Sequence, residues 1–335
     1  MLTPALDDAR ALLGEHPAID LHADTLMWSR WVHYDLLARH TPPLPRAALG
    51  GHVDIPRMRA GGMGAQFFGL VSLPFFGRTR GLARAVNEQI DALDEAIVRS
   101  QGKLRKVRTA GEIRDCQRDG AISALLGIEG AHTLEGDLDK LGTFANRGVR
   151  YLGLSHFSAN EACFPAYGRG RRDGDGLTAF GRDVVRRCEE LGVLVDLAHL
   201  NRTGFMQVCA SATKPPIVSH TGASGAFEHW RNIDDEQLRV VAAKGGTVGV
   251  IFCPRFVGGD GHAPIVRHIT HIVDVAGDDT PALGSDWDGF IVPSAGLGDP
   301  TGLPFLVEAM RSGGLTDGTI GKILRGNVLR VLDDA

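Results

Sequence analysis

Short apolar runs recur along the chain, and longer segments with helical spacing separate them. Most of the runs are nearly continuous in apolar residues, which is typical of strands buried on both faces, as in parallel sheets. The pattern predicts eight such strands, at 18–24, 65–73, 121–130, 149–156, 194–199, 216–220, 247–252 and 282–289.

The segments between the runs predict helices. Apolar residues recur at helical spacing in 81–100, 178–192, 234–246 and 316–334. Gly192 stands where a helix C-cap is expected, and Asp234 and Asp235 stand where N-caps are expected.

Strand and helix alternate eight times, which predicts an α/β fold of the (β/α)8 TIM barrel type. No proline-rich or serine-rich linker divides the chain, so we expect one domain over residues 1–335. The alternative fold is an open doubly wound sheet, which should carry a glycine-rich phosphate loop after an early strand. The glycine-rich stretch 59–66 lacks the spacing of such a loop.

Six of the eight runs end on histidine, aspartate or glutamate, which are residue types that commonly bind metal ions. In a (β/α)8 barrel these ends meet at one mouth, where active-site residues project. Each group alone would be a helix cap or a satisfied core residue. Gathered together, the carboxylates would repel one another and the imidazoles would lose hydration, unless a divalent cation compensates. The groups are His22, Asp24, Glu129, His156, His199, His220 and Asp286.

Five of these groups suit a pair of cations. Residues two apart in a strand point the same way, so His22 and Asp24 can bind one ion together. His199 and His220 come from neighbouring strands and can bind a second ion, and Glu129 has two oxygens and can bridge. Three protein ligands per ion leave positions open for water, as in catalytic sites. A ligand set of imidazoles and carboxylates without thiolate favours zinc, with manganese or cobalt as alternatives.

Three further residues would complete a hydrolytic site. Water between two cations becomes a nucleophile near neutral pH, and Asp286 is the candidate general base. His156, not needed as a ligand, could hydrogen-bond the oxyanion of a tetrahedral intermediate. Arg231 could hold a substrate carboxylate bidentately, although a surface role as a loop cap explains this residue equally well.

Composition limits the cellular compartment and the classes of binding partner that we expect. The net charge of −4 argues against nucleic acid, and no apolar run is long enough to span a bilayer. The N-terminal stretch does not resemble a secretory leader, and the five cysteines never occur as C-x-x-C. We therefore expect a cytoplasmic protein with a small-molecule partner.

Nine motifs follow one another between about residue 18 and residue 332. They are IDLHADT, GGMGAQFFGL, GIEGAHTL, VRYLGLSH, GVLVDLAHL, PPIVSHTGA, RNIDDEQL, GSDWDGF and LRGNVLRVL. Together they resemble the membrane (renal) dipeptidase family, peptidase family M19, within the amidohydrolase-like barrels. Each motif is weak singly, but nine in the family's order are specific.

The resemblance implies two zinc ions held by matching residues. His22 and Asp24 match the ligands of the first zinc, Glu129 matches the bridging carboxylate, and His199 and His220 match the ligands of the second zinc.

The resemblance also implies an activity. His156 matches a residue that contacts the substrate's carbonyl, Arg231 matches the one that holds its C-terminal carboxylate, and Asp286 matches the acid–base residue. Family members cleave dipeptides and tolerate a C-terminal D-residue. We therefore expect a binuclear zinc dipeptidase that attacks with a metal-bridging hydroxide, and a homodimer by family analogy.

Residues 157–176 depart from the family's "CNTPWAD"-like loop and should line the pocket. Arg169, Arg171 and Arg172 in this segment could favour an acidic substrate side chain, although such a run is more often a solvated loop. Phe75 and Phe76 are candidates for the pocket wall or for packing.

Two other functions stay open. The same metal site could act on another small amide or on a natural-product intermediate, because the pocket loops rather than the ligands set the substrate. A metal-binding barrel without turnover is the alternative of another class. Asp286 argues against it, because a non-catalytic site needs no acid beside the water.

Overall fold

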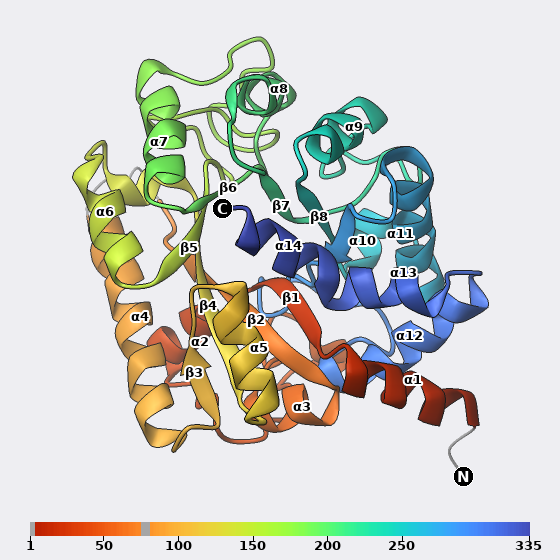
Figure 1. Cartoon of the computed structure of the whole chain (residues 1–335). Coiled ribbons are helices and arrows are strands. Elements are labelled where there is room, and N and C mark those ends of the chain that lie inside the picture. Colours follow the sequence, from red (N-terminus) through yellow and green to blue (C-terminus); the bar gives the residue numbers. More distant parts are fainter. Residues whose placement is uncertain (1–3, 75–80) are drawn as a thin grey trace.

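The computed structural model describes residues 4–74 and 81–335, and eight parallel strands at its centre close into a barrel (Figure 1). These strands are β1 (Ala18–Ala23), β2 (Met63–Val71), β4 (Ile122–Glu129), β5 (Val149–Gly153), β6 (Leu194–Asp196), β7 (Ile217–Thr221), β8 (Thr247–Val250) and β9 (Pro281–Leu283). Pairing of β2 with β4 closes the ring, in which all eight predicted runs take part. The (β/α)8 prediction is confirmed, and the open doubly wound alternative is wrong.

Helices surround the ring (Figure 1). They are α1 (Pro4–Glu15), α2 (Thr25–Val32), α3 (Ile55–Ala60), α4 (Leu82–Arg99), α5 (Ala110–Arg118), α6 (Asp139–Asn146), α7 (Ala179–Glu190), α8 (Arg202–Ser211), α9 (Asp235–Ala243), α10 (Pro254–Val257), α11 (His262–Ala276), α12 (Leu303–Ser312), α13 (Asp317–Gly321) and α14 (Asn327–Asp333). Within the described residues, 3-10 turns lie at Pro45–Ala47, Ala131–Leu134 and Pro300–Gly302, and a π-helical turn at Lys322–Gly326 joins α13 to α14. None of these helices combines the length and apolar character needed to cross a bilayer.

All four predicted helices form, the last of them as α13 and α14 with the π-helical turn between them. Gly192 and Asp234 occupy the predicted capping positions, whereas Asp235 is the first residue of α9. Gly192 has a φ of +61° just after α7, a conformation that glycine adopts without strain. The side chain of Asp234 accepts a hydrogen bond from the backbone N–H of Gln237 at the start of α9. In return, the side chain of Gln237 accepts a hydrogen bond from the backbone N–H of Asp234.

Strand β3 and helix α1 are among the elements that the sequence pattern did not predict. Strand β3 (Leu104–Lys106) pairs with the first residues of β4 and adds a ninth strand to the sheet. It is three residues long and has no apolar run that could signal it. Helix α1 has an apolar stripe of Leu6, Ala9, Leu12 and Leu13 that is buried, in part against α12.

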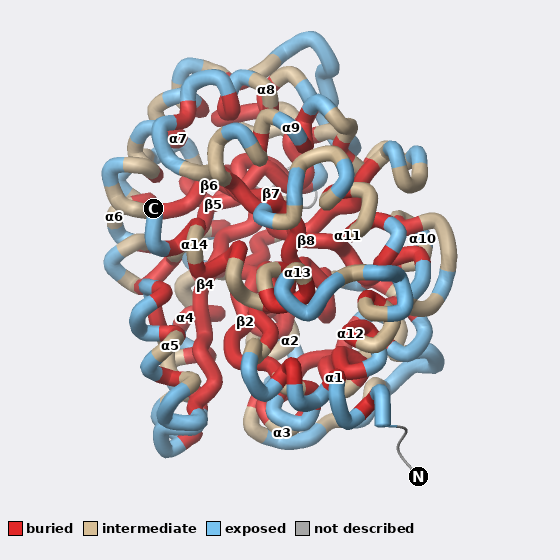
Figure 2. The backbone as a smooth tube through the Cα atoms, turned by 45° about the vertical axis from the view of Figure 1, so that its right-hand side comes forward, coloured by how far each residue is buried: buried red, intermediate tan, exposed pale blue. Residues whose placement is uncertain are grey.

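The barrel strands divide their side chains between two apolar clusters. Phe67 and Leu125 belong to an inner cluster, and their neighbours Phe68 and Leu126 belong to the larger cluster that faces the helices. Residues of α14, including Val328, join the inner cluster at the amino ends of the strands. Figure 2 shows the barrel strands largely buried, with the exposed residues on the outer helices and loops. The opposite, carboxyl end of the barrel is therefore the one free to hold polar groups.

Gly127 on β4 makes room for the ring of Tyr151 on β5 inside the barrel, since a Cβ at Gly127 would overlap that ring. We expect Gly127→Ala to lower the free energy of unfolding by about 1–3 kcal/mol or more, because the ring is enclosed and cannot move away freely. Denaturant unfolding measures this difference. Gly14→Ala in α1 is the control, since no atom lies within 4 Å of the added Cβ. Equal loss of stability in both variants would contradict the packing argument.

Candidate metal centre

The seven polar groups predicted at strand ends all gather at the carboxyl end of the barrel. Their positions follow directly from the strands. His22, Glu129 and His220 belong to β1, β4 and β7, and Asp24, His156, His199 and Asp286 follow β1, β5, β6 and β9. None of the seven residues is more than 8% exposed. The structure therefore brings together every residue that the sequence singled out for this end.

Glu129 lies at the middle of the cluster. Its Oε1 is 3.1 Å from Nε2 of His199, 3.5 Å from Nε2 of His220 and 3.8 Å from Nε2 of His22. Its Oε2 is 3.3 Å from Nε2 of His156. One carboxylate thus faces four imidazoles from different parts of the chain.

Several of these buried atoms have no suitable hydrogen-bond partner in the described residues. Nε2 of His22, Oδ1 of Asp24 and Oε2 of Glu129 make no hydrogen bond of normal geometry. Nε2 of His199 and Nε2 of His220 lie 3.0 Å apart, so two ring nitrogens face each other. Buried polar atoms without partners are costly and rare in native proteins, unless an ion or water satisfies them. The donor set fits a divalent cation.

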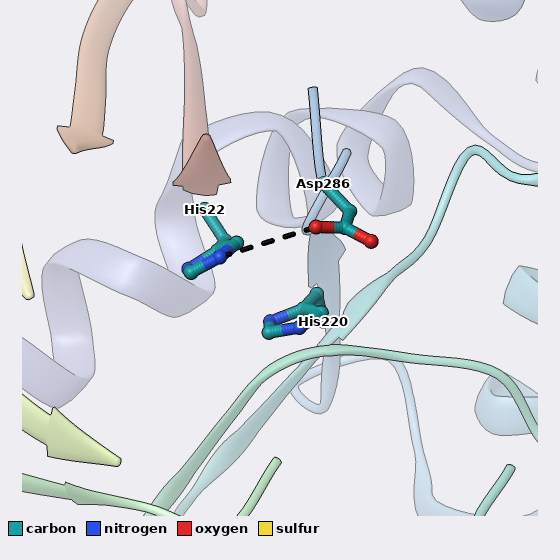
Figure 3. A group of neighbouring side chains, drawn as sticks. All are labelled: His22, His220 and Asp286. Atoms are coloured by element: carbon teal, nitrogen blue, oxygen red, sulfur yellow. Dashed lines mark ion pairs between the residues drawn. The ribbon is translucent and has the colours of Figure 1, made fainter. Parts of the chain in front are cut away.

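Three overlapping groups of donors could each hold an ion, with ligand atoms all within 4.8 Å of one another. They are His22, Asp24 and Glu129; Glu129, His199 and His220; and His22, His220 and Asp286. Figure 3 shows the last group, in which the three side chains point toward one another from β1, β7 and the segment after β9. The rings of His22 and His220 stack with their centroids 4.0 Å apart, and Oδ1 of Asp286 is 4.0 Å from Nε2 of His22.

Burial and neighbouring positive charges hold the pKa values of His156, His199 and His220 well below the usual range of histidine. These three rings are therefore neutral at ordinary pH, which is the form in which imidazole binds a metal.

The pKa values of Glu129, Asp286 and His22 are raised instead. Burial raises the pKa of Glu129 well above its usual range, and raises that of Asp286 to about 7 despite the opposing charge of His22. Burial opposes the charge on His22, but the carboxylates of Asp24, Glu129 and Asp286 outweigh it and raise the pKa of His22 to about 10. Without an ion, the cluster retains protons that a cation would displace.

Contacts behind the cluster orient two of its rings. Nδ1 of His22 lies 2.7 Å from the hydroxyl of Tyr151. Nδ1 of His220 lies 2.8 Å from Oγ of Ser219, which donates to Oδ2 of Asp196 at 2.6 Å. These contacts hold both rings with Nε2 toward the centre of the cluster. Hydrogen bonds to the other ring nitrogen orient histidine ligands in metal sites in the same way. Sequence reasoning missed these partners, and the charge of Asp196 inside an apolar run was the available signal.

Gly69 of β2 explains why this strand supplies no polar group. A Cβ at Gly69 would overlap Oδ1 of Asp24 and lie 2.8 Å from Cε1 of His22. The strand therefore contributes space for the neighbouring side chains.

Arg231 lies beside the cluster and is only 5% exposed, so the alternative of a surface loop cap is wrong. Its Nη2 donates to the carbonyl oxygen of His220 at 2.6 Å and lies 3.3 Å from Nε2 of His199. Burial lowers the pKa of the guanidinium, while Asp286 and Glu129 favour its charge.

A cavity of about 500 Å³ opens above these groups. Its polar floor contains Asp24, Glu129, His156, His199, Arg231 and Asp286. Its walls are largely apolar and include Met27, Val71, Leu73, Phe157, Phe256, Phe290 and Ile291. Phe75 and Phe76, the other candidates for the wall, lie outside the described residues.

Comparisons with known proteins identify a family and several relatives. The family model described as "Membrane dipeptidase (Peptidase family M19)" matches residues 6–335. A Klebsiella pneumoniae protein named "Uncharacterized protein in pqqA 5'region" is 35% identical over 259 residues, which are 73% of this chain and 94% of that protein. Dipeptidase verJ of Clonostachys rogersoniana is 29% identical over 347 residues, covering 99% of this chain and 88% of the relative.

A solved structure is also similar. It is the metallo peptidase from Rhodobacter sphaeroides, liganded with a phosphinate mimic of the dipeptide L-Ala-D-Ala. The TM-score is 0.85 at 27% identity, and the match covers 95% of this chain and 99% of that one.

Protons retained by the metal-free cluster should make metal uptake depend on pH. We expect the affinity for Zn²⁺ to fall as the pH is lowered from about 8 to about 6, because protons on the raised-pKa groups compete with the ion. Titration calorimetry in buffers of different ionisation enthalpy would also detect the released protons. His271→Gln is the control, because His271 pairs with Asp235 outside the cluster. Uptake that does not change with pH would contradict the protonation argument.

Proposed function

The chain belongs to the membrane dipeptidase family, peptidase family M19, and from that premise we propose that it is a binuclear zinc dipeptidase. Membership makes it a hydrolase of the metallo-dipeptidase type that uses a divalent metal. The proposed substrates are free dipeptides, including those with a C-terminal D-residue. The observation that carries the proposal is the burial of unpartnered donor atoms around Glu129.

We assign five residues to hold the two ions. His22 and Asp24 would hold one, His199 and His220 the other, and Glu129 would be a ligand of both. Imidazole and carboxylate donors favour zinc, with manganese or cobalt as alternatives. When bound, the ions supply Lewis acidity, which makes water nucleophilic near neutral pH and polarises a carbonyl.

Asp286 is assigned the proton transfers of the reaction. Its carboxyl group lines the cavity, and burial raises its pKa to about 7 in the metal-free protein. A carboxylate there can accept the proton of the attacking water and deliver it to the leaving amine.

His156 and Arg231 are assigned to the substrate. The pKa of His156 is lowered by burial, so the ring is neutral and can donate one hydrogen bond to the developing oxyanion. Arg231 lines the cavity, and the hydrogen bonds that its guanidinium makes to the described residues use only Nη2. The remaining N–H groups can hold the C-terminal carboxylate of a dipeptide.

The cavity volume suits a small peptide, and the similar Rhodobacter sphaeroides structure holds a mimic of L-Ala-D-Ala. Both support a dipeptide substrate, and the mimic supports tolerance of a D-residue. We further propose that residues 1–335 form one domain, and that the protein is a homodimer. The five cysteines are buried and unpaired, which supports the proposed cytoplasmic location.

A screen of L-L and L-D dipeptides with the zinc-loaded protein tests this function. We expect cleavage that a chelator abolishes and added Zn²⁺ restores, because the activated water depends on the ions. A metal-loaded protein that cleaves no dipeptide would contradict the proposal and favour the non-catalytic alternative.

Asp286→Asn tests the proton-transfer assignment. We expect kcat to fall by about 10²-fold or more, because the amide cannot accept a proton, while the metal content stays at the wild-type value. Dipeptide kinetics and elemental analysis measure the two quantities. Asp274→Asn, at an exposed position on α11, is the control and should change neither. Activity that survives Asp286→Asn would show that another group is the base.

A further inference from the structure

Residues 157–176 form part of the cavity wall, and their backbone fixes the position of Arg169. The backbone N–H of Arg169 donates to the carbonyl of Phe157 at 2.9 Å, and the N–H of Ala159 donates to the carbonyl of Arg169 at 2.8 Å. Gly168 and Gly170, on either side of Arg169, have φ values of +117° and +75°. A Cβ at Gly168 would overlap the carbonyl oxygen of Phe157, so the chain can approach this closely only with glycine.

The three arginines of this segment differ in their partners. Arg171 forms a bidentate pair with Asp173, with distances of 2.6 Å and 2.9 Å. Arg172 lies 3.3 Å from Asp175. Both charges are therefore neutralised within the segment itself.

Arg169 has a different setting. Its side chain is exposed and lines the cavity that contains His156 and Asp286. No ion pair or side-chain hydrogen bond of Arg169 is found within residues 4–74 and 81–335. Among the described residues that line this cavity, Arg169 and Arg231 are the only arginines or lysines. Arg231 is buried at the floor, so Arg169 is a second cation, nearer to solvent.

We propose that Arg169 determines specificity by selecting substrates with a second carboxylate, such as dipeptides with an Asp or Glu side chain. The proposal rests on the proposed function, because it assumes that Arg231 takes the C-terminal carboxylate. A guanidinium pairs with a carboxylate through two parallel hydrogen bonds, and an arginine without a partner at a pocket entrance is available for such a pair. Partial solvent exposure limits the strength of the pair, so the preference should be moderate.

Matched substrates that differ only in charge test this proposal. With the zinc-loaded wild-type enzyme, we expect kcat/KM for a Glu-containing dipeptide to exceed that for its Gln counterpart by about fivefold. Both orders, Ala-Glu and Glu-Ala, are measured with L- and D-residues at the C-terminus. Added salt should reduce the preference, because ions screen an exposed pair.

Three variants separate charge from structure. Arg169→Ala should abolish the preference by lowering kcat/KM for the Glu-containing dipeptide to the value for its Gln counterpart, and Arg169→Lys should retain part of the preference. Arg169→Glu should reverse the preference toward a Lys-containing dipeptide. Arg171→Ala is the matched control, because the charge of Arg171 is already paired with Asp173.

The outcomes distinguish this proposal from the one on which it rests. Hydrolysis with equal kcat/KM for Glu and Gln substrates would overturn the role of Arg169 alone. A preference that survives Arg169→Ala, or an equal fall for every substrate, would also overturn it. A wild-type enzyme that cleaves no dipeptide at all would overturn both proposals.

Discussion

The placement of one buried carboxylate among histidine nitrogens is the constraint on which the rest of this structure depends. Oε1 of Glu129 lies between 3.1 Å and 3.8 Å from Nε2 of three histidines, which come from β1, β7 and the segment after β6. In the absence of an ion these buried donors compete for protons. Burial raises the pKa of Glu129, while it lowers the pKa values of His199 and His220. A pair of divalent cations would satisfy both kinds of donor, which is why we place the proposed chemistry here.

The barrel supports this cluster through packing and through backbone strain. His199 and Asp286 both have φ values of +63°, in a region that residues other than glycine adopt at a cost of order 1 kcal/mol or more. Strain of this kind persists where surrounding contacts fix the backbone, and the N–H of Asp286 donates to the carbonyl of His22 at 3.1 Å. Gly69 leaves the space beside His22 that a larger residue would fill. The site is thus built as much by small residues and strained turns as by its polar side chains.

The apolar runs predicted the barrel because each of its strands is buried on both faces, and the polar groups at the strand ends predicted the members of the cluster. Strand β3 left no such signal, because it is short and lies beside the ring. Partners such as Tyr151 were hidden for another reason, since an aromatic residue in an apolar run reads as packing. Sequence alone also could not separate Arg169 from Arg171 and Arg172, because pairing within the segment depends on how the chain folds back. Ligand types are thus readable from the sequence, whereas orientation and pairing require the fold.

The stoichiometry of metal binding tests the central claim most directly. Zinc-saturated protein would be freed of loose ions by gel filtration and its zinc per chain measured by elemental analysis, for the wild type and for Glu129→Gln. The account predicts two ions per wild-type chain and fewer than one in the variant, because the amide is a poor ligand and Glu129 is assigned to both ions. A wild-type protein that retains one ion or none, or a variant that retains two, would contradict it.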